Sequence, residues 1–192
     1  MTTLDTAPQA LGPAADPVRD STSVTGTGAT RRTLTIGPHT IDTPVVLAPM
    51  AGITNMAFRL LCREFGALHS EDDGGLFVGE MVTTRALVEG HRESWRLVTM
   101  GERETPRSVQ LYGVDPATVR RAVEMIRERD LADHIDLNFG CPVPKVTRKG
   151  GGAALPWKLD LFRGIVAAAV REATPYDVPV TVKMRVGIDA DH

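Results

Sequence analysis

The sequence has few cysteines, no long apolar run and almost no net charge. Its two cysteines, Cys62 and Cys141, are too few for a disulfide scaffold, and no pair of ligands stands at zinc-like spacing. No stretch of about 18 apolar residues could cross a membrane as a helix. The N-terminus also lacks the charged-then-apolar pattern of a secretory signal. These absences predict a cytoplasmic protein without a membrane span, a disulfide framework or a metal site.

The charge balance excludes a strongly basic protein. The 192 residues carry 22 Lys and Arg against 24 Asp and Glu, a formal net charge of −2 at pH 7. Overall charge therefore gives no sign of a nucleic-acid partner, and binding to RNA would need a local basic patch. The 42% share of hydrophobic residues is ordinary for a globular domain, and the length suffices to bury a core.

The chain divides into a polar tail and a patterned region. Residues 1–30 are rich in Thr, Ala, Pro and Gly without apolar periodicity, which predicts a disordered tail. Residues 31–43 predict a short extended segment or a hairpin, with alternating apolar residues before a Gly37-Pro38 turn. The polar, glycine-rich segment 69–75 predicts a surface loop. We take 31–192 as one structural region.

From residue 45 onward, short apolar runs alternate with helical patterns. The runs predict buried strands at 45–48, 76–78, 108–111, 134–137 and 180–183. Helical spacing predicts helices from Thr54 or Asn55, over 83–89, from Asp115-Pro116 and over 162–170. The first helix is expected to bury Phe58, Leu61, Cys62 and Phe65 on its apolar face.

Strand–helix alternation predicts an α/β fold with a parallel sheet and outer helices. A doubly wound open sheet and a (β/α)8 TIM barrel both fit this pattern. Pro49-Met50-Ala51-Gly52 follows the first strand in place of a glycine-rich phosphate loop, which argues against a dinucleotide-binding start. A barrel needs eight strands and typically about 250 residues. The sequence therefore predicts an incomplete TIM barrel with about five strands.

The candidate site follows from that fold, because barrel active sites gather at the carboxyl ends of the strands. The residues at these ends are Pro49, Met50, Ala51, Glu80, Gln110, Asn138, Cys141, Lys183 and Arg185. Each one could instead cap a strand or point into solvent. Taken together, they predict a polar rim over apolar strand interiors, suited to a polar planar ligand.

Cys141 differs from Cys62 in its surroundings. It lies on a turn between Gly140 and Pro142, and the segment that follows holds Lys145, Arg148 and three glycines at 150–152. This composition predicts a mobile, positively charged loop that could contact phosphates, although a solvated charge cluster is the alternative. Nearby cations favour a reactive thiol, which can also act as a general acid. Cys141 is therefore a candidate catalytic residue.

Four segments together resemble the tRNA-dihydrouridine synthases, in the order of that family. They are Leu47–Asn55, Glu80–Val82, Leu137–Pro142 with its continuation through Lys145-Val146 and 150–155, and Val182–Gly187. The cysteine segment is the most specific of them, because other flavin barrels share something like the first.

The resemblance implies an FMN-dependent TIM barrel that reduces uridine in tRNA to 5,6-dihydrouridine with NADPH as reductant. Pro49, Met50 and Ala51 would line the flavin, while Gln110, Asn138 and Lys183 would contact its ring. Asn138, Arg185, Lys145 and Arg148 would contact the substrate. Cys141 would protonate C5 of the uracil as hydride reaches C6, and the target base would leave its stack.

The resemblance also implies a second barrel half and a C-terminal helical RNA-binding domain, which we expect to be absent from these 192 residues. The chain alone is then expected to bind FMN weakly and to have little activity. Two alternatives remain open at this point. One is an FMN barrel dehydrogenase of a small pyrimidine such as dihydroorotate or a dihydropyrimidine. The other is an inactive chain whose open sheet edge serves as an interaction surface.

Overall fold

The computed structural model describes residues 33–68 and 74–185. Contacts divide the chain into units 1–30 and 31–192, and every described residue belongs to the second unit. The predicted disordered tail at 1–30 and residues 69–73 of the predicted surface loop lie outside the described residues. Within these ranges, none of the helices is long and apolar enough to cross a bilayer.

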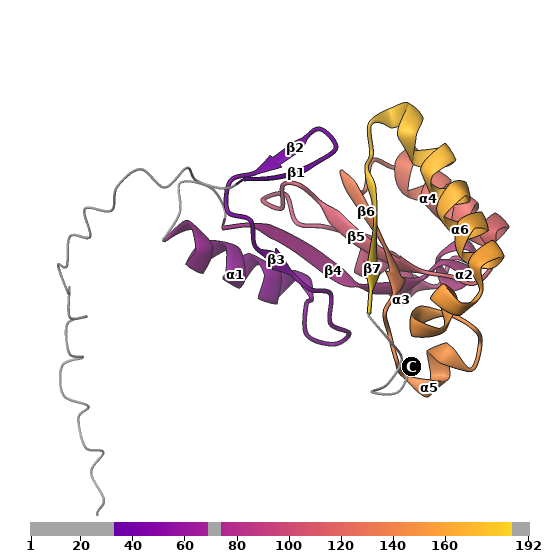
Figure 1. Cartoon of the computed structure of the whole chain (residues 1–192). Coiled ribbons are helices and arrows are strands. Elements are labelled where there is room, and N and C mark those ends of the chain that lie inside the picture. The colour runs from indigo at the N-terminus through magenta and orange to yellow at the C-terminus, as the bar shows by residue number, and fades with distance from the viewer. Residues whose placement is uncertain (1–32, 69–73, 186–192) are drawn as a thin grey trace, which may run out of the picture. The chain divides into compact units, whose positions relative to one another are not determined.

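Five parallel strands form a curled sheet in the second unit (Figure 1). They are β3 (Val46–Leu47), β4 (Leu76–Thr83), β5 (Ser108–Tyr112), β6 (His134–Phe139) and β7 (Val180–Met184). Each strand pairs with the next along the chain, in the order β3-β4-β5-β6-β7. A doubly wound sheet would reverse its strand order at a switch point, whereas this sheet does not. The prediction of an incomplete TIM barrel is confirmed.

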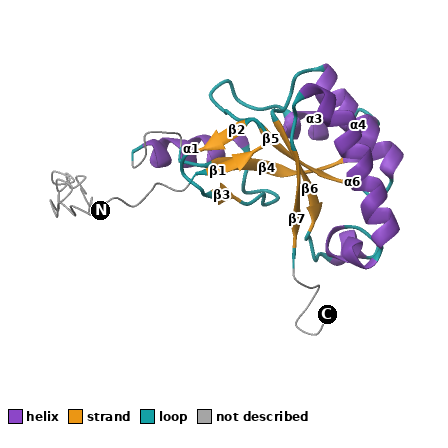
Figure 2. Cartoon of the chain, turned by 45° about the horizontal axis from the view of Figure 1, so that its top comes forward, coloured by secondary structure: helices purple, strands orange, loops and turns teal. Residues whose placement is uncertain are grey.

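Helices cover the outer face of this sheet (Figure 2). They are α1 (Met56–Ala67), α2 (Thr84–Val88), α3 (Arg92–Val98), α4 (Pro116–Glu128), α5 (Pro144–Thr147) and α6 (Leu159–Ala173), with 3-10 turns at Gly152–Trp157 and Thr174–Tyr176. The helices α4 and α6 pack along each other on the sheet. The sequence pattern missed α3, α5 and both 3-10 turns, because such short elements carry too few periodic residues.

The helix α4 agrees with its sequence pattern. Asp115 caps it by accepting a hydrogen bond from the Thr118 amide at 2.9 Å, and Pro116 stands in the first turn, where a missing N–H costs nothing. Its predicted apolar face is buried, and consists of Val119, Ala122, Val123 and Ile126. These side chains meet the outward-facing residues of the strands in the main core.

The helix α1 contradicts its sequence pattern. Its buried residues are Arg59 and Arg63, while Phe58, Leu61 and Phe65 are 36%, 47% and 60% exposed. Arg59 faces inward because it pairs with buried Glu104, and the guanidinium of Arg63 lies 4.8 Å from the centre of the Phe77 ring. Two arginines with partners of their own therefore occupy the inner side of the helix. The expectation that the apolar stripe forms core is wrong, and Cys62 is only half-buried.

Of the two alternatives predicted for residues 31–43, the structure has the hairpin: β1 (Leu34–Ile36) and β2 (His39–Ile41) pair antiparallel. Gly37 makes the turn with a φ of +56°, a conformation that favours glycine. The hairpin joins the amino-terminal ends of the strands, since His39 Nε2 contacts the Asp133 carbonyl oxygen at 2.9 Å. It therefore lies at the end of the sheet opposite to the candidate site.

Candidate functional site

A pocket of about 290 Å³ opens at the carboxyl ends of the strands. Its lining comes from β4, β5, β6 and β7 and from the segments that follow β3, β6 and β7. It comprises Pro49, Ala51, Met81, Gln110, Asn138, Gly140, Cys141, Pro142, Lys183 and Arg185. Seven of these residues were predicted from strand ends alone. The structure thus brings most of the predicted rim into one hollow.

Four predicted residues lie outside this lining, and one of them, Glu80, contacts the backbone of the segment after β3 instead. Met50 is 38% exposed and does not line the pocket. Lys145 and Arg148 are exposed on and just after α5, also outside the lining. Their assignments to flavin and substrate stay predictions. Met81, Gly140 and Pro142 line the pocket without having been singled out as contacts, although all three belong to the recognised motifs.

The segment after β3 is held rigidly beneath the pocket. The Met50 amide donates to Thr54 Oγ1 at 2.9 Å, and the Thr54 hydroxyl donates back to the Met50 carbonyl at 3.2 Å. Glu80 accepts a short hydrogen bond from the Gly52 amide. A bulge in β4, between Val78 and Met81, accompanies this placement of Glu80, because bulges re-aim side chains. Glu80 therefore shapes the Pro49–Ala51 segment and does not line the pocket itself.

The Cys141 turn is held by Asn138. The Asn138 Oδ1 atom accepts from the amides of Gly140 at 3.2 Å and Cys141 at 2.9 Å. Its Nδ2 atom donates to Gln110 Oε1 at 2.9 Å. The half-buried thiol of Cys141 lies close enough to Tyr112 to contribute, after burial, to raising the pKa of that phenol. One asparagine thus links the turn to the barrel interior.

The glycines after Cys141 do not form the predicted mobile loop. Residues 144–147 form α5, and the 3-10 turn that begins at Gly152 packs back onto the turn through the Ala153 amide, which donates to the Cys141 carbonyl at 3.0 Å. A side chain at Gly151 would collide with Tyr112, and one at Gly152 would collide with the Cys141 backbone. The lack of side chains at Gly151 and Gly152 therefore lets this segment pack directly against Tyr112 and the Cys141 backbone.

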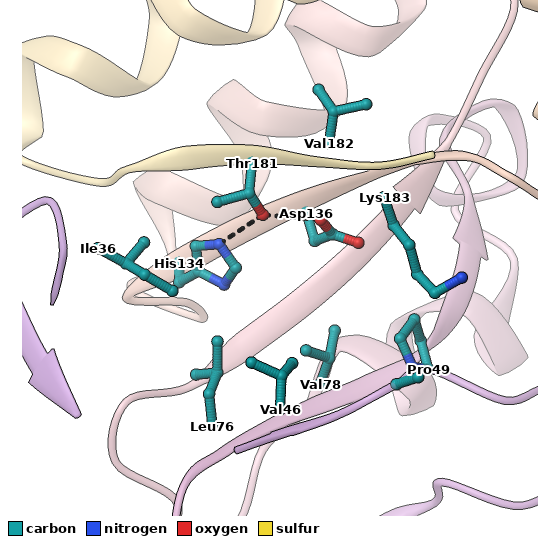
Figure 3. A pocket seen from close by; sticks show the side chains of 11 residues that line it. Ile36, Val46, Pro49, Leu76, Val78, His134, Asp136, Thr181, Val182 and Lys183 are labelled. Carbon is teal, nitrogen blue, oxygen red and sulfur yellow. Dashed lines mark hydrogen bonds between the residues drawn. The ribbon is translucent and has the colours of Figure 1, made fainter. Parts of the chain in front are cut away.

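The barrel interior is more polar than predicted. Inward-facing residues of β5, β6 and β7 form a hydrogen-bonded cluster of buried Ser108, Gln110, His134 and Asp136 with half-buried Thr181. Part of this cluster borders a second hollow of about 360 Å³, into which Lys183 extends toward Pro49 (Figure 3). The expectation of apolar strand interiors is wrong. Alternate positions in His134–Asn138 are polar, a period-two signal that could have identified the inner face.

Burial shifts two pKa values in this cluster. Desolvation, followed by the charge of His39, lowers the pKa of His134 from 6.5 to about 4. Desolvation raises the pKa of Asp136, opposed by hydrogen bonds from Thr181 and Gln110 and by the charge of Lys183. His134 is therefore neutral at pH 7, and its two ring nitrogens have different hydrogen-bonding roles.

The His134 shift predicts an acid-sensitive fold. Between pH 6.5 and pH 4 the unfolded chain takes up a proton on His134 and the folded chain does not, so falling pH favours unfolding. The shift corresponds to about 3 kcal/mol lost by pH 4. Urea unfolding at pH 7, 5 and 4 should show that His134→Gln loses less stability on acidification than wild type. Equal losses in both proteins would contradict this account.

Comparison with known proteins agrees with the geometry. The family model described as dihydrouridine synthase matches residues 46–192. A probable tRNA-dihydrouridine synthase of Mycobacterium tuberculosis is 58% identical over 159 residues, covering 83% of this chain and 41% of the relative. The corresponding Mycobacterium leprae protein is 53% identical over 166 residues, covering 77% of this chain and 43% of that relative.

A relative of lower sequence identity matches a segment of similar length. The tRNA-dihydrouridine synthase B of Pseudomonas aeruginosa is 44% identical over 158 residues, covering 82% of this chain and 44% of the relative. The chain thus spans less than half the length of the curated relatives it matches. In the described ranges, no cluster of three or more His, Cys, Asp or Glu side chains could hold a metal ion. From its strand order, its rim and these matches, the chain belongs to the dihydrouridine synthase family.

Proposed function

We propose that this chain forms the flavin-facing part of an enzyme that reduces uridine in cytoplasmic tRNA to 5,6-dihydrouridine, with FMN as cofactor and NADPH as reductant. The observation that carries the proposal is the single pocket that joins Cys141, Asn138, Gln110 and Lys183 at consecutive strand ends. The relatives at up to 58% identity, named as synthases that act on tRNA, support the same substrate.

The residues present fit the ring of FMN. Gln110 and Asn138 line the pocket, and each side-chain NH₂ group has two N–H bonds, of which one is donated within the protein; Lys183 adds an ammonium group. Three donors suit the acceptor-rich edge of an isoalloxazine ring, and the positive charge of Lys183 favours the anionic reduced form. Pro49 and Ala51 supply apolar and backbone contacts at the opposite wall. When bound and reduced, FMN supplies the hydride for C6 of the uracil.

Cys141 supplies the proton. Its S–H bond breaks as a C–H bond forms at C5 of the uracil, so that hydride and proton together saturate the C5–C6 double bond. The resulting thiolate regains its proton from solvent, and the half-buried position of Cys141 leaves that route open. Asn138 keeps the thiol in place by holding the Gly140 and Cys141 amides.

The exposed cations suit the RNA backbone. Arg185 borders the pocket, while Lys145 and Arg148 lie on the surface beside the Cys141 turn. We assign these three residues to phosphate contacts, which position the RNA without reading its sequence. The target uridine would be flipped out of its stack to reach the pocket.

The test compares the 192-residue chain with a chimaera that adds the part of the M. tuberculosis relative beyond the matched segment. The chimaera should bind FMN stoichiometrically and, with NADPH, form dihydrouridine in an unmodified tRNA transcript, detected by mass spectrometry. The chain alone should bind FMN weakly. Failure of the chimaera to bind FMN would overturn the proposal, and reduction of free pyrimidines without tRNA would favour a small-molecule dehydrogenase.

A further inference from the structure

A continuous line of hydrogen bonds crosses the barrel interior and ends at the Cys141 turn. Ser108 Oγ lies 2.7 Å from His134 Nδ1. His134 Nε2 lies 2.9 Å from Thr181 Oγ1, a contact drawn as a dashed line in Figure 3. The Thr181 hydroxyl donates to Asp136 Oδ1 at 2.7 Å. Asp136 Oδ2 accepts from Gln110 Nε2 at 2.6 Å, and Gln110 Oε1 accepts from Asn138. The line therefore joins β5, β6 and β7.

At the Cys141 end, the backbone dictates the direction of donation. The amides of Gly140 and Cys141 can only donate, so Asn138 must turn its carbonyl oxygen toward them. Its NH₂ group then faces Gln110, which must offer its own carbonyl oxygen in return. The Gln110 NH₂ group is thereby directed at Asp136. An amide flip at either residue would leave buried polar groups without partners.

At the other side of Asp136, the same logic applies to the histidine. A carboxylate can only accept, so the Thr181 hydroxyl gives its hydrogen to Asp136 and must accept from His134 Nε2. His134 then carries its proton on Nε2, and Nδ1 accepts from the Ser108 hydroxyl. Every donor on the line between Ser108 and Asn138 points toward Asp136, which is itself 6% exposed.

We propose that Asp136 is a positioning residue: by accepting from Gln110 and Thr181 it holds the orientation that the turn amides impose on Asn138 and Gln110, and so keeps the Cys141 turn in place. The consequence for flavin rests on the function proposed above. Gln110 and Asn138 line the pocket with amide groups held in this orientation, and Asp136 supports that orientation without lining the pocket itself.

The first test needs no activity and no cofactor. The ¹⁵N chemical shifts of the His134 imidazole in the 192-residue chain at pH 7 should show the proton on Nε2. Asp136→Asn offers one acceptor and one donor, so its NH₂ group would face Thr181 and reverse the bonds beyond it. His134 should then carry its proton on Nδ1. A proton on Nδ1 in wild type, or no change in Asp136→Asn, would overturn the proposal.

The second test asks whether the hydrogen bonds accepted by Asp136 stabilise the Cys141 turn. Asp136→Ala removes both acceptors and should speed hydrogen exchange of the Gly140 and Cys141 amides by about tenfold relative to the Val123 amide in α4. Ser108→Ala breaks the same buried line at its far end and should leave those two amides unchanged. Equal effects of both variants on the turn would show that only general packing is at work, and would refute the role of Asp136.

Flavin binding separates this proposal from the proposed function. In the chimaera, Asp136→Ala should weaken FMN binding by about tenfold, whereas Ser108→Ala should change it less than twofold. If wild-type chimaera binds no FMN, the proposed function fails while the histidine and exchange results still decide the role of Asp136. If FMN binds equally to all three proteins, the link from Asp136 to the flavin is wrong. Should Asp136→Ala not fold, the His134 tautomers of wild type and Asp136→Asn decide the role of Asp136.

Discussion

In the chimaera, replacing Cys141 with alanine should lower the rate of dihydrouridine formation by about two to four orders of magnitude, the usual contribution of a general acid. The loss follows because the pocket places Cys141 beside Asn138 and Lys183 at the strand ends. Affinity for FMN should change less than twofold, since the ring contacts assigned to Gln110 and Lys183 remain. Single-turnover oxidation of the reduced chimaera by unmodified tRNA, followed by flavin absorbance, measures the effect.

The chain provides its own control for this experiment in the second thiol. Cys62 is half-buried on α1 and lies outside the residues that line the pocket. Cys62→Ala should retain the wild-type rate within a factor of two. A Cys141→Ala protein that keeps more than a tenth of that rate would rule out the cysteine as the main proton donor.

Replacing Glu104 with alanine destabilises the fold by about 3–5 kcal/mol, the usual cost of removing one partner from a buried ion pair. Glu104 and Arg59 are each 2% exposed, with N–O distances of 2.5 and 2.9 Å, and the truncation leaves the guanidinium charge uncompensated. Glu104 also accepts from the Gly101 amide at 2.7 Å. Since whole domains are stable by about 5–15 kcal/mol, urea unfolding should show a large shift in midpoint.

The matched control is an ion pair of similar geometry on the surface. Arg96 and Glu93 approach to 2.5 Å but are 63% and 67% exposed. Water and salt screen such a pair, so Glu93→Ala should leave the urea midpoint unchanged within error. Comparable shifts for Glu104→Ala and Glu93→Ala would mean that burial is not what makes the first pair important.

The Arg59–Glu104 pair also links stability to the site. Arg59 donates to the Thr54 carbonyl at 2.7 Å, and Thr54 holds the Met50 backbone through its hydroxyl. Loss of Glu104 should therefore loosen the Pro49–Ala51 wall of the pocket as well as α1. This connection explains why a helix whose apolar stripe points outward is nonetheless firmly placed.

The sequence by itself determined those local structures that are held by contacts between residues close together in the chain. The cap at Asp115, the apolar face of α4 and the turn at Gly37 were all predictable, because each rests on contacts within a few residues. The rim was predictable for a related reason. Parallel strands joined by helices bring their carboxyl ends to one edge, so residues after consecutive strands must meet there.

Tertiary structure alone decided which residues touch across strands and which face of α1 is inside. The line through Asp136 exists because the register places Gln110 and Thr181 opposite it on β5 and β7, and a shift of one residue would turn all three away. The inward arginines of α1 depend on Glu104, which lies 45 residues from Arg59 in the sequence, and on Phe77, which lies 14 residues from Arg63. The spacing of apolar residues in the sequence indicates which side of a helix or strand is apolar. The partners that satisfy a buried charge come from distant segments, and only folding brings them together.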